Sequence, residues 1–150
     1  MNILVFSDSH GRTDEMSEMI RKISPDLILH LGDYDRDAEV LRKAFPHIPI
    51  RNVRGNCDVG SSAPELDNFT VEGKRIVMAH GHRYGVKYGL EALYDLVRLT
   101  EADVLLFGHT HIPHLEQIGE MYVVNPGAAN RSCALVYIAD GEVSCTHYAL

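Results

Sequence analysis

The sequence predicts an α/β protein in which two β-sheets pack face to face with helices on their outer sides. One observation is that short apolar runs alternate with amphipathic helical patterns through the first third of the chain. Another is a change after residue 64, beyond which hairpin turns and short strands dominate. Strand–helix alternation is typical of parallel sheets with right-handed crossovers, whereas hairpins build antiparallel ones. At 150 residues, the chain is expected to form one domain, residues 1–150.

The first part of the chain alternates three strands with two helices. We expect the strands at Ile3–Phe6, Leu27–Leu31 and Ile50–Val53. The helices are expected from Thr13 to Ile23 and from about Arg36 to Phe45. Thr13 can cap the first helix, and a proline follows each helix and ends it. The acidic residues of both helices are assigned to solvent-facing sides.

The remainder mixes hairpins with one more helix. A hairpin is expected over 69–79, with its turn at Glu72-Gly73-Lys74. A third helix carries Val86, Leu90, Leu93 and Val97 on one face, and Val104–Phe107 forms a buried strand. The tail predicts an antiparallel meander of four strands at Leu115–Ile118, Tyr122–Val124, Ala134–Ile138 and Val143–Tyr148.

Composition narrows the class of protein. The chain is 45% hydrophobic and 23% charged, which is ordinary for a soluble globular domain. A net charge of −7 argues against a nucleic-acid backbone as the partner. No apolar run approaches the roughly 18 residues that cross a membrane. Three cysteines without a CxxC pair or a secretory signal favour reduced thiols in the cytoplasm. The oligomeric state is left open, a homo-oligomer included.

Five apolar strands each end in side chains that bind metals. The candidate ligands are Asp8, His10, Asp33, Asn56, His80, His109 and His111. Strand ends of this kind meet at one edge of an open sheet, where ligands bind. Carboxylate, amide and imidazole ligands without thiolate suit Mn²⁺, Fe²⁺ or Zn²⁺, and also Ni²⁺ or Co²⁺. Seven ligands exceed the need of one ion with an open position, and they fit two ions that share a carboxylate.

Each of these residues also has a simpler interpretation when taken alone. Asp8, Asp33 and Asn56 could be turn formers, and His80 could be a buried histidine with satisfied hydrogen bonds. Two imidazoles two residues apart behind Gly108 are harder to explain in this way. The recurrence after five strands therefore favours a metal site. His30, inside an apolar run, is assigned to the core or to support of the ligands.

At these residues the sequence resembles the calcineurin-like metallophosphoesterase family, in its small prokaryotic phosphodiesterase branch. The matching motifs are Asp8-Ser9-His10, Gly32-Asp33, Gly55-Asn56-Cys57-Asp58, His80-Gly81 and Gly108-His109-Thr110-His111, in the family's order. Asn125-Pro126-Gly127 is similar to a loop of the same branch. The resemblance implies a four-layer α/β/β/α sandwich of two mixed sheets with helices on the outer faces.

The resemblance also implies roles for the candidate ligands. Asp8, His10 and His111 would bind the first metal, Asp33 would bridge, and Asn56, His80 and His109 would bind the second. The expected cofactors are two divalent ions, Mn²⁺ first, with Ni²⁺, Fe²⁺, Zn²⁺ or Co²⁺ as alternatives. The implied reaction is hydrolysis of a small phosphodiester by metal-activated water. Asn56 and His82 are the candidate catalytic side chains, with His82 as a proton donor to the leaving group.

One position departs from the protein-phosphatase branch, where His follows the motif Asn. Cys57 stands there instead, as it often does in the small phosphodiesterase branch. A thiol is a poor general acid at neutral pH, which favours diesters over monoesters. Asp58 is expected to orient neighbouring groups. The alternatives are a phosphomonoesterase, or a non-catalytic protein-interaction scaffold of the same fold, which the complete ligand set disfavours.

Overall fold

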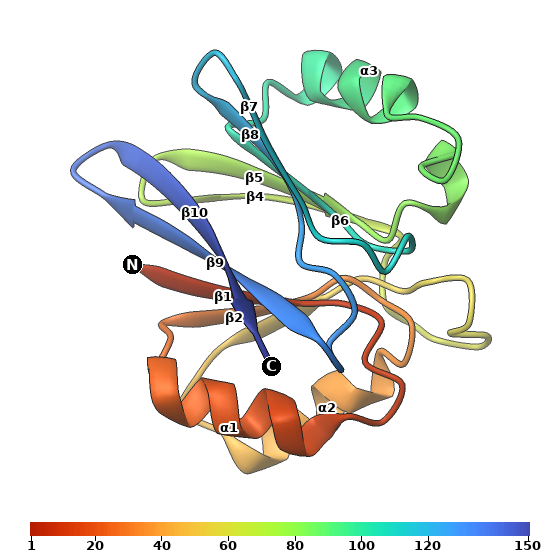
Figure 1. Cartoon of the computed structure of the whole chain (residues 1–150), viewed down its shortest axis with the longest axis vertical. Helices are drawn as coiled ribbons and strands as arrows, with labels where there is room; N and C mark the ends of the chain where they lie inside the picture. The colour runs from red at the N-terminus through yellow and green to blue at the C-terminus, as the bar shows by residue number, and fades with distance from the viewer.

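The computed structural model describes all 150 residues, and two five-stranded sheets face each other between helices (Figure 1). The first sheet has the order β10-β9-β1-β2-β3, and the second has the order β4-β5-β6-β8-β7. Helices α1 and α2 cover the outer face of the first sheet, and α3 covers the second (Figure 1). The prediction of a four-layer α/β/β/α sandwich of two mixed sheets is confirmed.

The elements of the first sheet and its helices come mostly from the start and the end of the chain. They are β1 (Asn2–Phe6), α1 (Thr13–Ile23), β2 (Leu27–His30), α2 (Arg36–Ala44), β3 (Ile50–Asn52), β9 (Ser132–Ala139) and β10 (Glu142–Ala149). The second sheet and its helices comprise β4 (Leu66–Val71), β5 (Lys74–Ala79), the 3₁₀ helix η1 (His82–Tyr84), α3 (Glu91–Thr100), β6 (Val104–Phe107), β7 (His114–Ile118) and β8 (Met121–Asn125).

Three clusters of buried apolar side chains fill the three spaces between the four layers. In β1, Ile3 and Val5 face the second sheet and pack in the central cluster. Leu4 and Phe6 of the same strand point the other way and pack against α1 and α2. A third cluster joins the outer face of β5 and β6 to α3. Burial on both faces explains why these strands are continuous apolar runs rather than alternating ones.

The tail differs from the predicted meander. Strands β7 and β8 form a hairpin that joins the second sheet, where β8 runs parallel to β6. Strands β9 and β10 form another hairpin that joins the first sheet, where β9 runs antiparallel to β1. Both sheets are therefore mixed, and neither half of the chain builds a sheet alone. Hairpin signals identify paired neighbours, but they do not say which third strand the pair joins.

Three local expectations were also wrong. Thr13 is the first residue of α1 and no side chain caps that helix. The third helix begins at Glu91, and Val86 packs beneath it from the preceding loop. Gly85 and Gly89, both with positive φ, lie on either side of Val86 and keep it out of the helix that begins at Glu91. Asp37 of α2 was expected on a solvent-facing side and is instead buried.

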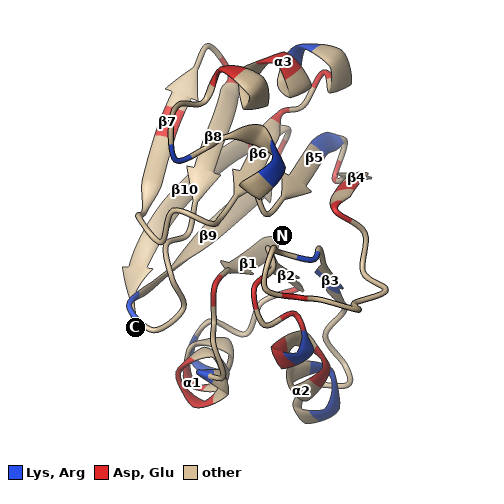
Figure 2. Ribbon diagram, turned by 90° about the vertical axis from the view of Figure 1, so that its right-hand side faces the viewer, with Lys and Arg blue, Asp and Glu red and all other residues tan.

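Charged residues lie mainly on the helices, the loops and the outer strands, and few lie in the middle strands of the sheets (Figure 2). None of the helices combines the length and the apolar character needed to cross a membrane. A few polar side chains are buried despite this distribution, and most of them lie where the strands of both sheets end.

Candidate metal centre

Loops from both sheets converge at one edge of the sandwich. Asp8 and Asp33 follow the parallel strands β1 and β2, and His80 and His109 follow the parallel strands β5 and β6. Two hydrogen bonds tie the sheets together here. The His109 N–H donates to Asp8 Oδ2 (3.1 Å), and His80 Nδ1 donates to the Leu31 carbonyl (2.8 Å). The predicted convergence of ligands on one rim therefore draws on both sheets.

The side chains form two groups of possible metal ligands. The first group is Asp8, His10, Asp33 and His111, and the second is Asp33, His80 and His109. Within each group the ligand atoms lie within 4.8 Å of one another. Asp33 belongs to both groups, as a carboxylate that bridges two ions would. The structure thus brings together six of the seven side chains named from the sequence.

His80 directs a nitrogen at two carboxylates. The ring is fully buried, and because Nδ1 donates to Leu31, Nε2 faces Asp33 Oδ2 (3.5 Å) and Asp8 Oδ1 (3.7 Å). Burial alone would lower the pKa of His80, but the two carboxylates outweigh it and raise the pKa. Burial would likewise raise the pKa of Asp33, yet hydrogen bonds from His80 and the Cys57 N–H lower it. This concentration of negative charge favours a cation at this place.

A buried oxygen of Asp8 has no hydrogen-bond partner. Its Oδ2 accepts from Ser7 Oγ (2.6 Å) and from the His109 N–H, whereas Oδ1 accepts no hydrogen bond. Oδ1 lies 3.1 Å from His111 Nε2, between the two strand-end loops. Orphaned buried carboxylate oxygens are rare and costly in proteins. A divalent cation bound by Asp8 and His111 would satisfy this oxygen, so the donor set fits a metal.

The backbone at the candidate ligands is left-handed. Five non-glycine residues of the two groups have positive φ: Asp8 (52°), His10 (46°), Asp33 (57°), His109 (69°) and His111 (61°). Such a conformation is found in only a few per cent of non-glycine residues, and strained backbone of this kind gathers at functional sites. An Asp in a turn adopts it at little cost, but a role as simple turn formers does not explain three histidines.

Close backbone approach between two loops shapes the bridging position. A Cβ atom on Gly32 would lie 2.5 Å from the nitrogen of Gly55, and one on Gly55 would overlap Asp33 Oδ1. The Asp58 carboxylate fixes the same loops by accepting from the N–H groups of Asp33 (2.8 Å), Gly55 (2.8 Å), Tyr34 (2.7 Å) and Asp35 (3.1 Å). Asp58 orients the backbone around Asp33, in line with the role expected from the sequence.

A buried chain of hydrogen bonds supports the Asp8–His10 loop; a supporting role was among those expected for His30, whereas the roles of Ser9 and Asp37 were not predicted. The Gly32 N–H donates to His30 Nδ1 (3.2 Å), so His30 Nε2 donates to Ser9 Oγ (2.8 Å). Ser9 Oγ in turn donates to Asp37 Oδ2 (2.7 Å), which also accepts the Gly11 N–H (2.8 Å). Burial lowers the pKa of His30 to about 4, which keeps it neutral. The helical spacing of Asp37 and Leu41, four residues apart, was the available signal for an inward-facing Asp37.

Loss of this support should weaken metal binding. In Asp37→Ala the Ser9 hydroxyl and the Gly11 N–H lose their acceptor, so the loop that carries His10 loosens. Changes to groups that orient ligands typically cost about 10- to 100-fold in metal affinity. We expect a loss in this range for Mn²⁺ by calorimetry, with Glu39→Ala on the exposed side of α2 as the control. An unchanged affinity in Asp37→Ala would show that the loop holds its shape without this acceptor.

Asn125 holds the other ligand loop. This buried side chain donates from Nδ2 to the Gly108 carbonyl (3.0 Å) and to Thr110 Oγ1 (3.0 Å). Its Oδ1 accepts the Gly127 N–H (2.9 Å), which fixes the turn that carries the motif noted in the sequence. The motif therefore supports the site by holding Gly108 and Thr110, the residues on either side of His109.

Asn56 and Cys57 lie at the exposed end of the centre. The Cys57 N–H donates to Asp33 Oδ1 (2.9 Å), while the Asn56 amide nitrogen contacts Cys57 Sγ (3.6 Å). The side chain of Asn56 is exposed, and its role as a ligand stays a prediction. Desolvation, and then the Asp33 carboxylate, raise the pKa of the Cys57 thiol.

His82, in η1, stacks near the second group of ligands. Its ring centroid lies 5.5 Å from that of His80 and 6.2 Å from that of His109. Its Nδ1 is buried and has no hydrogen-bond partner. Burial, followed by the charge of His80, lowers the pKa of His82. The position suits a contact with a molecule bound at the centre, and the acid role stays a prediction.

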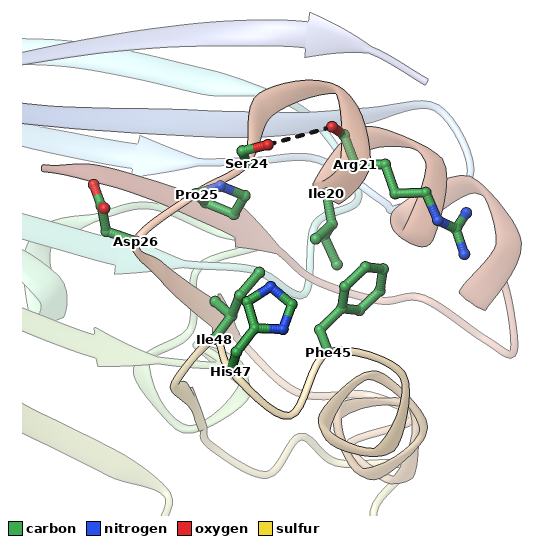
Figure 3. Close-up of a pocket in the computed structure, with 8 residues that line it drawn as sticks. All are labelled: Ile20, Arg21, Ser24, Pro25, Asp26, Phe45, His47 and Ile48. Atoms are coloured by element: carbon green, nitrogen blue, oxygen red, sulfur yellow. Dashed lines mark hydrogen bonds between the residues drawn. The ribbon is translucent and has the colours of Figure 1, made fainter.

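A separate hollow of about 530 Å³ lies between the ends of α1 and α2 (Figure 3). Ile20, Arg21, Phe45 and His47 are among its lining residues. It also contains Pro25 and Asp26, which precede β2, whereas Asp33 follows β2. The hollow is therefore at the opposite edge of the sheet, and it shares no residue with the metal centre.

Comparison with known proteins identifies the family. Residues 1–140 match the calcineurin-like phosphoesterase superfamily domain. The chain belongs to this superfamily. It is 33% identical to the probable metallophosphoesterase YsnB of Bacillus subtilis over 131 residues, covering 85% of this chain and 75% of the relative. It is 28% identical to the phosphodiesterase YfcE of Escherichia coli over 156 residues, covering 87% of this chain and 80% of YfcE.

Solved structures show the same fold. A zinc complex of Vps29 from Entamoeba histolytica superimposes with a TM-score of 0.79, at 22% identity, covering 99% of each chain. Calcineurin-like phosphoesterases use divalent metals to hydrolyse phosphoesters, and the Asp and His cluster of this chain could bind such metals. The family and the unpartnered Asp8 oxygen thus both indicate a metal centre.

Proposed function

We propose that this protein is a dinuclear metal-dependent phosphodiesterase that hydrolyses a small phosphodiester. The observation that carries the proposal is that two groups of ligand atoms share Asp33. Two ions that share a carboxylate sit about 3.5–4 Å apart, a spacing suited to a phosphoryl group. The match to the phosphoesterase superfamily supports this substrate class. We also propose a cytoplasmic location, which the three free cysteines support.

The ligand roles in this proposal follow the two groups. Asp8, His10 and His111 would hold the first ion, Asp33 would hold both, and His80 and His109 would hold the second. Asn56 would join the second ion, as the sequence resemblance implies. When bound, the ions supply positive charge to the phosphoryl oxygens and lower the pKa of a water. Mn²⁺ is the proposed ion, with Ni²⁺, Fe²⁺, Zn²⁺ and Co²⁺ as alternatives, because the ligands are oxygen and nitrogen atoms without thiolate.

The supply of a proton to the leaving group supports diesters as substrates. In the reaction the oxygen of water bonds to phosphorus, the bond to the leaving oxygen breaks, and that oxygen takes up a proton. His82 is the proposed donor, and burial lowers its pKa, which disfavours the protonated form that donates. Cys57, with a raised pKa, is a weak acid as well. Esters whose leaving groups need little protonation are therefore the better substrates.

Two other functions can be built on the same fold. A phosphomonoesterase would need a stronger acid than Cys57 supplies at this position. A non-catalytic scaffold would not need the ligands, yet His80, His109 and His111 are all present and lie around Asp8 and Asp33. The cluster of six ligand side chains and its strained backbone favour the enzyme.

The test is hydrolysis of bis(p-nitrophenyl) phosphate and of p-nitrophenyl phosphate by purified protein. The protein is first treated with a chelator and then supplied with Mn²⁺ or one of the alternative ions. We expect turnover of the diester that disappears on chelation, returns with metal and is absent from Asp8→Asn and His111→Ala. A folded protein that hydrolyses neither ester with any of these ions would reject the enzyme in favour of the scaffold.

Cys57→His should change the preference between monoester and diester substrates. An imidazole at this position supplies a stronger acid, so the rate for an alkyl phosphate monoester, whose leaving oxygen must be protonated, should rise about tenfold relative to the rate for bis(p-nitrophenyl) phosphate, whose leaving group needs little protonation. Cys57→Ser is the matched control, since it removes the thiol without adding an acid. Equal monoester-to-diester ratios in Cys57→His and Cys57→Ser would show that the leaving-group proton does not limit the reaction.

A further inference from the structure

Two clefts of different chemistry flank the metal centre. One is built by loops of the first sheet and is called the polar cleft. Its lining residues are His10, Tyr34, Asp35, Arg36, Cys57, Asp58, Val59, Gly60 and Ser61. The other is built by loops of the second sheet and is called the apolar cleft. Its lining residues are Val86, Lys87, Leu90, Phe107, Thr110, Ile112 and His114. Their volumes are about 580 and 530 Å³, sizes that admit small organic groups.

Each cleft adjoins the metal centre through its own lining. The polar cleft contains His10, a candidate ligand of the first ion. The apolar cleft contains Thr110, which lies between His109 and His111 in the chain. A molecule held at the centre therefore has a cleft on each side.

The apolar cleft offers exposed hydrocarbon surface to a ligand. Ile112 is 67% exposed although it is a large apolar residue, and Leu90 is half-buried beside it in the lining. Phe107 closes the inner end and contacts the His114 ring, with centroids 5.9 Å apart. Only Lys87 in this cleft carries a permanent charge. An alkyl or aryl group is the ligand that such a surface stabilises.

The polar cleft presents a guanidinium group without a carboxylate partner. Arg36 stacks over the Tyr34 ring, 4.4 Å from its centroid, and Tyr34 in turn contacts the His10 ring at 4.8 Å. Arg36 makes no ion pair. The two carboxylates of the cleft are already engaged, since Asp58 accepts four backbone N–H groups and Asp35 accepts the Ser61 hydroxyl. Arg36 is therefore free to bind oxygen atoms of a ligand.

On the basis of the proposed function, we propose that the substrate is an unsymmetrical phosphodiester with an apolar ester group on one side and a carboxylate-bearing group on the other. The two ester groups of a tetrahedral phosphate diverge, so a phosphate at the metals directs them to different sides. The apolar group occupies the cleft of Leu90 and Ile112, and the carboxylate bonds to Arg36. A monoester would leave one cleft empty.

The experiment uses alkyl 4-carboxyphenyl phosphates with methyl to hexyl chains, whose carboxyphenolate leaving group needs little protonation, and the Mn²⁺-loaded protein. Hydrolysis is followed by ³¹P NMR. Each methylene that enters the apolar cleft should raise kcat/KM about two- to fourfold. Ile112→Ser should reduce the ratio of hexyl to methyl rates at least about threefold. Leu99→Ser is the matched control, because Leu99 is an exposed leucine of α3 that lines neither cleft.

Arg36→Gln separates the two clefts. It should lower kcat/KM for the methyl and hexyl esters equally and leave their ratio unchanged. Hexyl and methyl esters with equal rates, or an unchanged ratio in Ile112→Ser, would overturn the proposal. Turnover of bis(p-nitrophenyl) phosphate in the same preparations tests the phosphodiesterase separately. Calorimetric binding of O-hexyl and O-methyl methylphosphonate tests the apolar cleft without turnover, and equal affinities would also overturn the proposal.

Discussion

Asp33→Ala is expected to remove both metal ions and to lower phosphodiester hydrolysis by about three orders of magnitude or more. Asp33 is the one side chain common to the two ligand groups, so its loss leaves each group incomplete. A defect of this size corresponds to about 4 kcal/mol of lost transition-state stabilisation. Metal content by mass spectrometry and turnover of bis(p-nitrophenyl) phosphate measure the two effects.

Two further variants keep this test decisive. Asp33 Oδ1 also accepts the Cys57 N–H, so Asp33→Asn retains an acceptor for the loop while it removes the charge. Asp14→Ala changes an exposed carboxylate of α1 and should leave metal content unchanged. Two bound ions per chain in Asp33→Ala would disprove the shared carboxylate.

Gly55→Ala is expected to damage the centre almost as severely, although it replaces no ligand residue. The added Cβ would overlap Asp33 Oδ1 and lie 2.6 Å from the Asp33 nitrogen, so one of the two loops must move. Forced backbone shifts of this kind destabilise a protein by about 1–3 kcal/mol. The same shift displaces the bridging carboxylate, so metal content should fall together with the free energy of unfolding in urea.

Gly60→Ala in the same loop provides the comparison. Gly60 has a φ of 81°, and no atom lies within 4 Å of the place that an added Cβ would take, so the methyl group meets only backbone strain. That strain costs about 1–2 kcal/mol and leaves Asp33 in place. Equal losses of metal in Gly55→Ala and Gly60→Ala would mean that contact with Asp33 is not the cause.

The position of the metal centre could be predicted from the sequence because it depends on local pattern. A buried strand that stops at Asp8 or His109 must place that residue at a sheet edge, whatever the partner strands are. Such a pattern carries no information about which strand pairs with which, and the predicted meander failed for that reason. The assignment of β9 to the first sheet depends on packing across the whole chain.

The supporting residues were the harder part to predict. Asp37 belongs to a helix rich in charges, and an acidic residue there is usually solvated. The cost of burying its carboxylate is offset only by hydrogen bonds from Ser9 Oγ and the Gly11 N–H, which lie 28 and 26 residues away in the sequence. The prediction that Val86 lies in the third helix was wrong for a different reason. Its apolar spacing continued the helical pattern, but Gly85 and Gly89, with positive φ, interrupt the helix there. In each case a distant contact or the backbone overrode a local pattern.

The pairing of β9 with β1 has a consequence for the order of events during synthesis. Strand β1 lies between β2 and β9, so one of its edges has no partner until Ser132–Ala139 has left the ribosome. The bond between His109 and Asp8 spans 101 residues of chain and cannot close until His109 has been synthesised. A nascent chain that already contains Asp8, His10 and Asp33 thus still lacks the other ligands of the proposed metal site. We therefore expect C-terminal truncation to abolish the proposed metal binding as thoroughly as loss of a ligand.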